Sequence, residues 1–162
     1  MKHLAIIYHS LSGGTEALAQ AVLHGARQET QVSSRLVRAF DAGIEDLKKS
    51  DAIIFGTPEN FGYMSGALKD FFDRTYDAAL PLQLNLPYAI FISAGNDGSG
   101  AVREIDRILR GYPMRRVADP LIALSGKTPG SIAPVKKTSG RILQQCEELG
   151  TTMAAGLALG IF

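Results

Sequence analysis

Residues 4–20 read LAIIYHSLSGGTEALAQ, and this stretch decides the fold. An apolar run ends at Tyr8, the small residues SLSGGT follow at positions 10–15, and apolar residues then recur at helical spacing from Glu16 onward. This pattern predicts a buried strand, a tight loop and a helix. Because the first N–H groups of a helix lack partners and carry the positive end of its dipole, such a loop favours an anion. We therefore interpret it as a phosphate cradle.

The residues that this loop lacks exclude several known kinds of phosphate-binding loop. A Walker-type loop ends in a lysine, and the dinucleotide fingerprint needs three glycines at G-x-G-x-x-G spacing, but residues 10–15 offer neither. A phosphatase needs a nucleophile such as cysteine, and the only cysteine is Cys146. A receiver domain needs carboxylates at the strand ends, whereas the third strand is expected to end in Gly56 and Thr57. The loop is predicted to bind a phosphate through neutral donors and to leave it intact.

The composition is typical of one domain spanning residues 1–162. Hydrophobic residues make up 46% of the chain, and no apolar run approaches the ~18 residues of a membrane span. Seventeen basic and sixteen acidic residues give a formal charge of +1, so no overall field favours nucleic acid or membrane. We therefore expect a soluble, cytoplasmic protein with neither as a partner. The single cysteine agrees with a reducing compartment.

Apolar strands and amphipathic helices alternate along the chain. The predicted strands cover residues 4–8, 31–39, 51–55, 88–93 and a part of 115–124. The predicted helices cover residues 16–28, 66–79, 101–111 and 140–157, with a short helix or turn over 44–49 and a long loop over 125–139. The polar second strand suits a sheet edge, Pro58 is expected to end the third strand, and Pro120 interrupts the last. Crossover helices indicate an α/β fold with a parallel sheet covered on both faces. Ligands of such sheets bind at the carboxyl ends of the strands.

Three of the loops at these ends carry specific motifs. They are SLSGGT at residues 10–15, GTPENFGYMSGALKD at residues 56–70 and SAGNDG at residues 93–98. Taken together they resemble the flavodoxin-like FMN proteins, and among these the short NAD(P)H-dependent FMN reductases and quinone oxidoreductases first described as tryptophan-repressor-binding proteins. The resemblance implies a single-domain flavodoxin-like three-layer sandwich, with a five-stranded parallel sheet in the order 2-1-3-4-5, and bound FMN.

The resemblance also assigns cofactor-binding roles. The phosphate would be held by Ser10, Ser12, Gly13, Gly14 and Thr15. One side of the isoalloxazine would be lined by Pro58, Glu59, Asn60, Phe61 and Gly62, and the other side or the ribityl chain by Ser93, Gly95, Asn96, Asp97 and Gly98. A planar ring with polar edges needs flat apolar walls and backbone hydrogen-bonding groups at its rim, which suits these residue types.

Some of these side chains admit a plainer interpretation. Glu59 and Asp97 are either charges that influence the flavin or solvated loop carboxylates, and Phe61 either faces a ligand or fills a gap under its loop. Cys146 falls on the apolar stripe of the last helix and is expected to be a packed core thiol, while His9 suits a strand-end surface position. Two basic pairs, at residues 115–116 and 136–137, suit solvated faces, with contact to a nicotinamide nucleotide's phosphates as the alternative.

Two functions remain open from the sequence. The first is an oxidoreductase in which NAD(P)H passes a hydride to FMN and FMN reduces a quinone or similar acceptor, so that no side chain is itself catalytic and no metal is needed. The second is a flavodoxin-type electron carrier between partner proteins. Such carriers usually have a strongly acidic face, which a near-neutral chain lacks in net terms, and this favours the enzyme. The short chain lacks room for tetramer-forming insertions, which leaves a monomer and a homodimer open.

Overall fold

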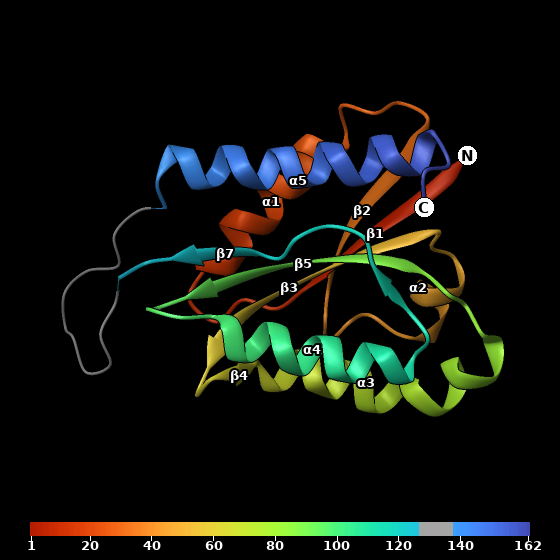
Figure 1. Ribbon diagram of the computed structural model, residues 1–162, viewed down its shortest axis with the longest axis horizontal. Helices are drawn as coiled ribbons and strands as arrows, with labels where there is room; N and C mark the ends of the chain where they lie inside the picture. Colours follow the sequence, from red (N-terminus) through yellow and green to blue (C-terminus); the bar gives the residue numbers. More distant parts are fainter. Residues whose placement is uncertain (127–137) are drawn as a thin grey trace.

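The computed structural model describes residues 1–126 and 138–162, and its centre is a parallel sheet (Figure 1). The neighbouring strands follow the order β2-β1-β3-β5, and two short strands then pair with the outer side of β5. Their bounds are β1 (Lys2–Tyr8), β2 (Val32–Arg38), β3 (Ala52–Asn60), β5 (Pro87–Ala94), β6 (Arg115–Arg116) and β7 (Leu121–Leu124). The expected order 2-1-3-4-5 is confirmed when β6 and β7 are counted as the two halves of the fifth strand, and β2 lies at the edge as predicted.

The fifth strand is broken in its middle. Its first half, β6, pairs with Pro87 and Tyr88 at the start of β5, and its second half, β7, pairs with the end of β5 from Phe91 onward. Residues 117–120 join the halves. The N–H of Val117 still donates to the Tyr88 carbonyl over 2.9 Å, whereas Pro120 has no N–H to donate. This break, together with the short strand β4 (Tyr63–Met64), gives a sheet of seven strands where five were expected.

Strand β3 corrects another prediction, because Pro58 does not end it. The strand runs on to Asn60, and Pro58 stands in register with Ser93 of β5. The Gly56 carbonyl accepts a hydrogen bond from the N–H of His9, so it points toward β1. Backbone groups two residues apart in a strand point to the same side, so the nitrogen of Pro58 also points toward the end of β1. The proline removes only the next hydrogen bond of this ladder, at the point where β1 ends, and leaves the pairing with β5 intact, which is why the strand tolerates it.

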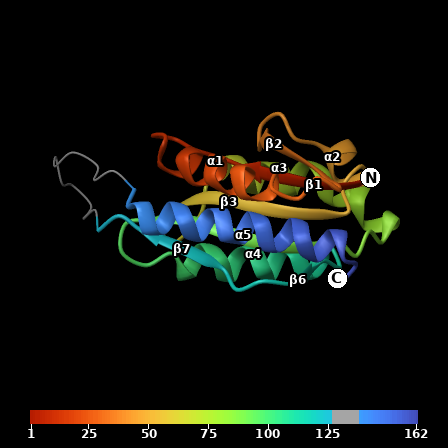
Figure 2. The same ribbon diagram turned by 90° about the horizontal axis from the view of Figure 1, so that it is seen from above.

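The helices form two layers. On one face of the sheet lie α1 (Gly14–Ala26) and α5 (Gly140–Ala158), and on the other lie α2 (Ile44–Lys48), α3 (Gly66–Ala79), the 3-10 turn η1 (Leu80–Leu82) and α4 (Ser99–Gly111) (Figures 1 and 2). Two clusters of buried apolar side chains fill the spaces between the layers, one on each face. Cys146 is fully buried in the cluster under α1 and α5, and burial raises the pKa of its thiol to about 12. It is a packed core residue, as predicted.

Helices α1 and α5 touch through their backbones. A Cβ added to Gly25 would lie 1.9 Å from the carbonyl oxygen of Glu147, and one added to Gly150 would lie 2.0 Å from that of Val22. The hydroxyl of Thr151 also donates a hydrogen bond of 3.1 Å to the Gly25 carbonyl. Only glycine permits such a close approach, so these contacts fix α1, and with it the loop in front of α1.

The loop predicted over residues 125–139 lies mostly outside the described residues, as does the basic pair at 136–137. No helix of the described part is long and apolar enough to cross a membrane.

Candidate functional site

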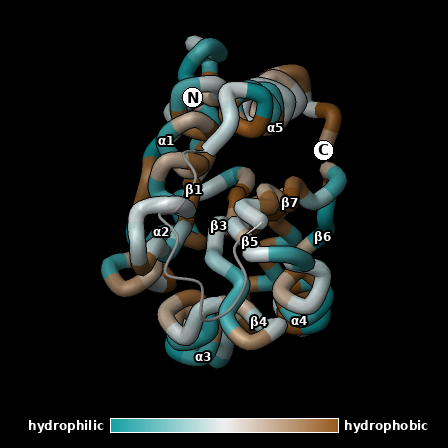
Figure 3. Tube along the Cα trace, turned by 90° about the vertical axis from the view of Figure 1, so that its left-hand side faces the viewer, coloured by the Kyte–Doolittle hydropathy of each residue, from teal (hydrophilic) through white to brown (hydrophobic). Residues whose placement is uncertain are grey.

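Three loops meet at the edge of the sheet where the parallel strands end. Figure 3 looks onto this edge, with α1 and α5 on one side of the strands and α3 and α4 on the other. The loop after β1 reaches the end of β5, because a Cβ on Gly14 would lie 3.5 Å from Oγ of Ser93. The hairpin formed by β3 and β4 packs on the start of α4, where a Cβ on Gly100 would lie 2.1 Å from the Gly62 carbonyl oxygen. The motifs predicted to act together are therefore adjacent in space.

The loop after β1 has the geometry of an anion cradle. Gly13 adopts the left-handed conformation, with φ 91°, and its N–H donates to Oγ of Ser10 over 3.1 Å. Among residues 1–126 and 138–162 no side chain caps the start of α1, whereas Ser65 caps α3 and Ser139 caps α5 through their hydroxyls. The first N–H groups of α1 are therefore available to a ligand, and their dipole favours a negative one.

The hairpin presents an aromatic ring to solvent. Asn60 pairs with Tyr63, so that only Phe61 and Gly62 form the turn, with φ 54° and 71°. Two positive φ values are typical of a type I′ turn, in which glycine, asparagine and aspartate are the usual residues. Phe61 is fully exposed, so it fills no gap beneath the loop. Its exposed ring fits the predicted role as one wall of a flat ligand site.

Glu59 and Asp97 both have structural partners in the third loop. Oε2 of Glu59 accepts a hydrogen bond of 2.8 Å from the N–H of Gly98, which ties the hairpin to the start of α4. Asp97 accepts from the N–H of Ser99 over 3.3 Å and from its hydroxyl over 2.8 Å. Oε1 of Glu59, by contrast, is buried and has no hydrogen-bond partner in the part of the chain that the structure describes. A buried oxygen without a donor fits a ligand that brings an N–H group to this point.

The structure adds residues that the sequence did not single out as part of the site. Thr57 is fully buried, and its hydroxyl donates to Oγ of Ser65 over 3.1 Å and accepts from the N–H of Ser65 over 2.9 Å. These hydrogen bonds hold the base of the hairpin together, so Thr57 and Ser65 have a structural role. The N–H of Gly126, after β7, donates to the Gly95 carbonyl over 2.8 Å and supports the third loop from outside. No sequence signal marked Gly126, because its partner depends on the register of β5 and β7.

All predicted cofactor-binding residues lie on or beside these three loops. They are Ser10, Ser12, Gly13, Gly14, Thr15, Pro58, Glu59, Asn60, Phe61, Gly62, Ser93, Gly95, Asn96, Asp97 and Gly98. Thr15 is buried at the start of α1, while Ser12 and Asn96 are exposed at the rim. A tight uncapped loop, an exposed ring and a buried free acceptor fit the phosphate, the flat body and the polar edge of FMN.

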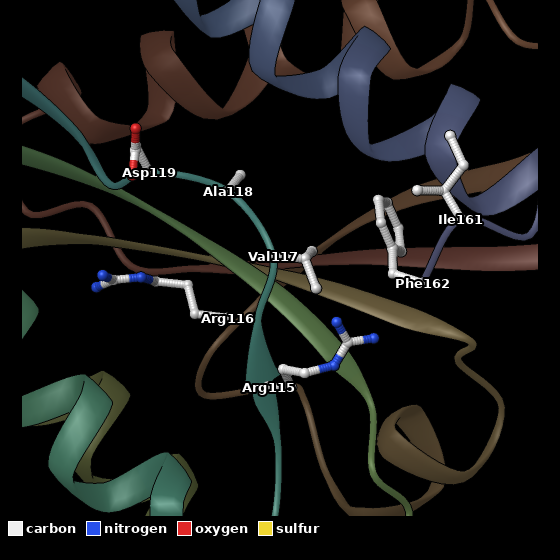
Figure 4. A pocket seen from close by; sticks show the side chains of 7 residues that line it. All are labelled: Arg115, Arg116, Val117, Ala118, Asp119, Ile161 and Phe162. Atoms are coloured by element: carbon white, nitrogen blue, oxygen red, sulfur yellow. The ribbon is translucent and has the colours of Figure 1, made fainter.

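The basic pair at residues 115–116 lies elsewhere. Arg115 and Arg116 pair with the first residues of β5, at the opposite end of the strand from residues 95–98. Their side chains point to different sides of β6 and help to line a hollow of about 560 Å³ beside Phe162 (Figure 4). Arg116 forms an ion pair with Asp106. The structure therefore does not bring this pair to the three loops. Among the described residues no group of three or more His, Cys, Asp or Glu side chains could hold a metal ion.

Comparison with known proteins identifies a family and relatives. Residues 28–128 match the family model described as NADPH-dependent FMN reductase, a span that includes the hairpin and the third loop. The chain is 37% identical over 95 residues to an NAD(P)H dehydrogenase (quinone) of Acidithiobacillus ferrooxidans, covering 46% of this chain and 48% of the relative. It is 35% identical over 99 residues to that of Archaeoglobus fulgidus, covering 46% and 52%. The chain thus spans about half the length of the curated relatives that it matches.

Solved structures share the fold over nearly the whole chain. A flavodoxin from the domain Archaea superposes with a TM-score of 0.76 at 24% identity, covering 96% of this chain and 98% of that one. A WrbA-like flavodoxin from Agrobacterium tumefaciens gives a TM-score of 0.75 at 19% identity, covering 99% of both chains. At these identities the likeness establishes the flavodoxin-like fold.

Proposed function

Because this chain belongs to the NADPH-dependent FMN reductase family, we propose that it binds FMN and acts as an NAD(P)H-dependent oxidoreductase that reduces a quinone or a similar acceptor. The observation that carries this proposal is the meeting of an uncapped α1 N-terminus with the β3–β4 hairpin and the loop at residues 95–98. The names of the curated relatives support NAD(P)H as the donor and a quinone as the acceptor.

In this proposal the chain binds and orients the cofactor. The N–H groups at the start of α1, with the hydroxyls of Ser10, Ser12 and Thr15, hold the phosphate without a basic side chain. Exposed Phe61 would line one side of the flat ring, and the buried, unpartnered Oε1 of Glu59 would accept a hydrogen bond from its polar edge. The redox chemistry there would be supplied by bound FMN, as a carrier of a hydride equivalent from NAD(P)H to the acceptor. The protein needs no acid or base of its own, since placing donor and flavin side by side is itself catalytic.

The electron-carrier function is the competing proposal. It is supported by the full-length likeness to a flavodoxin, which at 24% identity extends to the fold alone. A formal charge of +1 opposes it, because steering between partner proteins favours a strongly charged face.

Steady-state oxidation of NADH and NADPH, each measured with and without a soluble benzoquinone, distinguishes the oxidoreductase from the electron carrier. The oxidoreductase is expected to turn over repeatedly once loaded with FMN, and removal of FMN is expected to abolish turnover. Tight FMN binding without appreciable NAD(P)H oxidation would contradict the proposed oxidoreductase and support the electron carrier. A chain that takes up no FMN would overturn both.

We further propose that residues 1–162 form one domain that holds a complete FMN site, since the three loops belong to one sheet. One FMN per chain is the expected stoichiometry, and a titration of flavin fluorescence measures it. Sedimentation of the FMN-loaded chain distinguishes the monomer from the homodimer. A cytoplasmic location and the lack of a nucleic-acid or membrane partner remain predictions from composition.

A further inference from the structure

A separate hollow lies beside the cradle, between the carboxyl ends of β1 and β2. It has a volume of about 220 Å³ and is lined by Tyr8, His9, Ser10, Glu16, Arg38 and Phe40. Ser10 belongs to both the hollow and the cradle, so a ligand in the hollow would lie directly next to the predicted phosphate site. The three-loop site leaves the other five lining residues without a function.

The hollow has aromatic walls and a buried nitrogen without a partner. The rings of His9 and Phe40 stand edge to face, with centroids 5.7 Å apart and planes at 82°. Phe40 is 66% exposed, so a large part of its ring surface is free to contact a ligand. Nδ1 of His9 is buried and lacks a hydrogen-bond partner across residues 1–126 and 138–162. A flat ligand with ring nitrogens would satisfy both features.

The charges in the hollow are balanced. Oε1 of Glu16 accepts a hydrogen bond of 3.2 Å from the Tyr8 hydroxyl and lies 3.6 Å from Nη2 of Arg38. Burial, and then the nearby Arg38 guanidinium, lower the pKa of His9 from its ordinary value of 6.5, so the imidazole is neutral and offers one donor and one acceptor. Such a lining selects a neutral heteroaromatic group that carries an amine, rather than a bare anion. The Glu16 carboxylate can accept from the amine, and exposed Arg38 N–H groups remain for a phosphate attached to that group.

We propose that this hollow is the subsite for the adenosine end of the nicotinamide dinucleotide donor. The proposal rests on the proposed function and names where that donor is recognised. The volume suits a purine ring rather than a whole dinucleotide. The end of β2 lies three strand spacings from the end of β5, roughly 14 Å. A ligand made of two nucleotides can bridge that distance, with its nicotinamide at the hairpin and its adenine on Phe40.

The test is a calorimetric titration of the FMN-saturated chain with 5′-AMP and, as a matched ligand, 5′-UMP. FMN occupies the cradle, so the nucleotide phosphate cannot bind there, and the two probes differ only in the base. We expect 5′-AMP to bind at least tenfold more tightly than 5′-UMP. Phe40→Ala and Arg38→Met are each expected to weaken 5′-AMP at least fivefold, with the affinity for FMN unchanged. Arg103→Met removes the same charge from an exposed position on α4, outside the hollow, and is expected to change 5′-AMP binding less than twofold.

Each result has a definite meaning. Equal binding of 5′-AMP and 5′-UMP, or 5′-AMP binding that Phe40→Ala leaves unchanged, would overturn the adenosine subsite. If FMN does not bind, the same titration of the chain without FMN tests the subsite. Selective 5′-AMP binding by a chain that does not oxidise NAD(P)H would support the subsite and overturn the proposed function. NAD(P)H oxidation whose KM is unaffected by Phe40→Ala would support the function and overturn the subsite.

Discussion

Phe61 adopts a backbone conformation that side chains with a Cβ rarely occupy. Its φ of 54° and full exposure mean that neither local preference nor core packing accounts for phenylalanine at the hairpin tip. Strained residues of this kind cost about 1–3 kcal/mol each and tend to cluster at functional sites. The exposed ring at this position is consistent with the proposed contact to FMN.

We predict that Phe61→Asn stabilises the chain and weakens FMN binding. Asn-Gly is a preferred pair for a type I′ turn, so the free energy of unfolding without FMN is expected to rise by about 1 kcal/mol. FMN affinity is expected to fall, because the aromatic wall is lost. Urea unfolding and FMN titration measure the two effects.

Gln83→Asn is the matched control for this variant. Gln83 also has a positive φ, 45°, and is exposed just before the start of β5, at the opposite end of that strand from the third loop. It is expected to gain stability with no change in FMN affinity. Unaltered FMN binding by Phe61→Asn would contradict the role of the ring.

A substitution at Thr15 tests whether the loop after β1 binds the phosphate of FMN. Thr15→Val keeps the shape of a buried side chain and removes its hydroxyl. A hydrogen bond to a charged group is worth about 1.5–3 kcal/mol, so FMN is expected to bind roughly 10- to 100-fold more weakly, while riboflavin, which has no phosphate, is nearly unaffected. Fluorescence titration with both flavins measures this. Thr152→Val makes the same change on an exposed face of α5 and should affect neither ligand. Equal losses of FMN and riboflavin would refute the phosphate assignment.

At the level of elements, the position of the cradle depends on the crossing of α1 and α5. The Gly25 and Gly150 contacts bring the two backbones together, and α1 carries the cradle at its N-terminus. A side chain between these helices must push them apart, since the atoms that it would meet are backbone and cannot rotate away.

We predict that Gly150→Ala destabilises the chain despite the better helix propensity of alanine. Overpacking costs about 1–3 kcal/mol, and the gain in propensity offsets only about 1 kcal/mol. Gly140→Ala is the control in the same helix, because a Cβ there meets no atom of the described residues within 4 Å. It should be neutral or slightly stabilising. Thermal unfolding followed by circular dichroism measures both variants. A Gly150→Ala chain as stable as Gly140→Ala would contradict the close crossing.

The alternation of strands and helices and the strand order could be predicted from the sequence, because buried apolar runs and helical periodicity are local signals. The predictions that were wrong concern features that depend on how the strands pair with one another. Pro58 looked like a strand end, yet the strand continues because β1 has already stopped on that side. The small side chains at positions 10–15 are the local signal from which the cradle is predicted. The hydrogen bond between Glu59 and Gly98 joins segments 39 residues apart and has no local signature.

At the scale of the whole molecule, the site is an assembly of three loops that a ligand would hold together. We predict that FMN at 100 times its dissociation constant raises the free energy of unfolding by about 2.7 kcal/mol. For a chain of this size the midpoint of thermal unfolding should rise by roughly 5–10 °C. Differential scanning calorimetry with and without FMN measures the shift.

Riboflavin at the same concentration provides the control, since it offers the ring without the phosphate. It is expected to raise the midpoint much less than FMN. An identical rise for both flavins would mean that the start of α1 contributes nothing to binding, and no rise with FMN would contradict the site as a whole.

The broken outer strand has a consequence for how copies of this chain behave in a crowded solution. An intact edge strand offers a continuous row of free backbone groups on which another chain can build intermolecular β-structure. Here that edge is divided between β6 and β7, carries two arginines at one end and Pro120 in the gap, and so offers no long flat template. The irregularity makes this edge of the sheet a poor template for edge-to-edge aggregation.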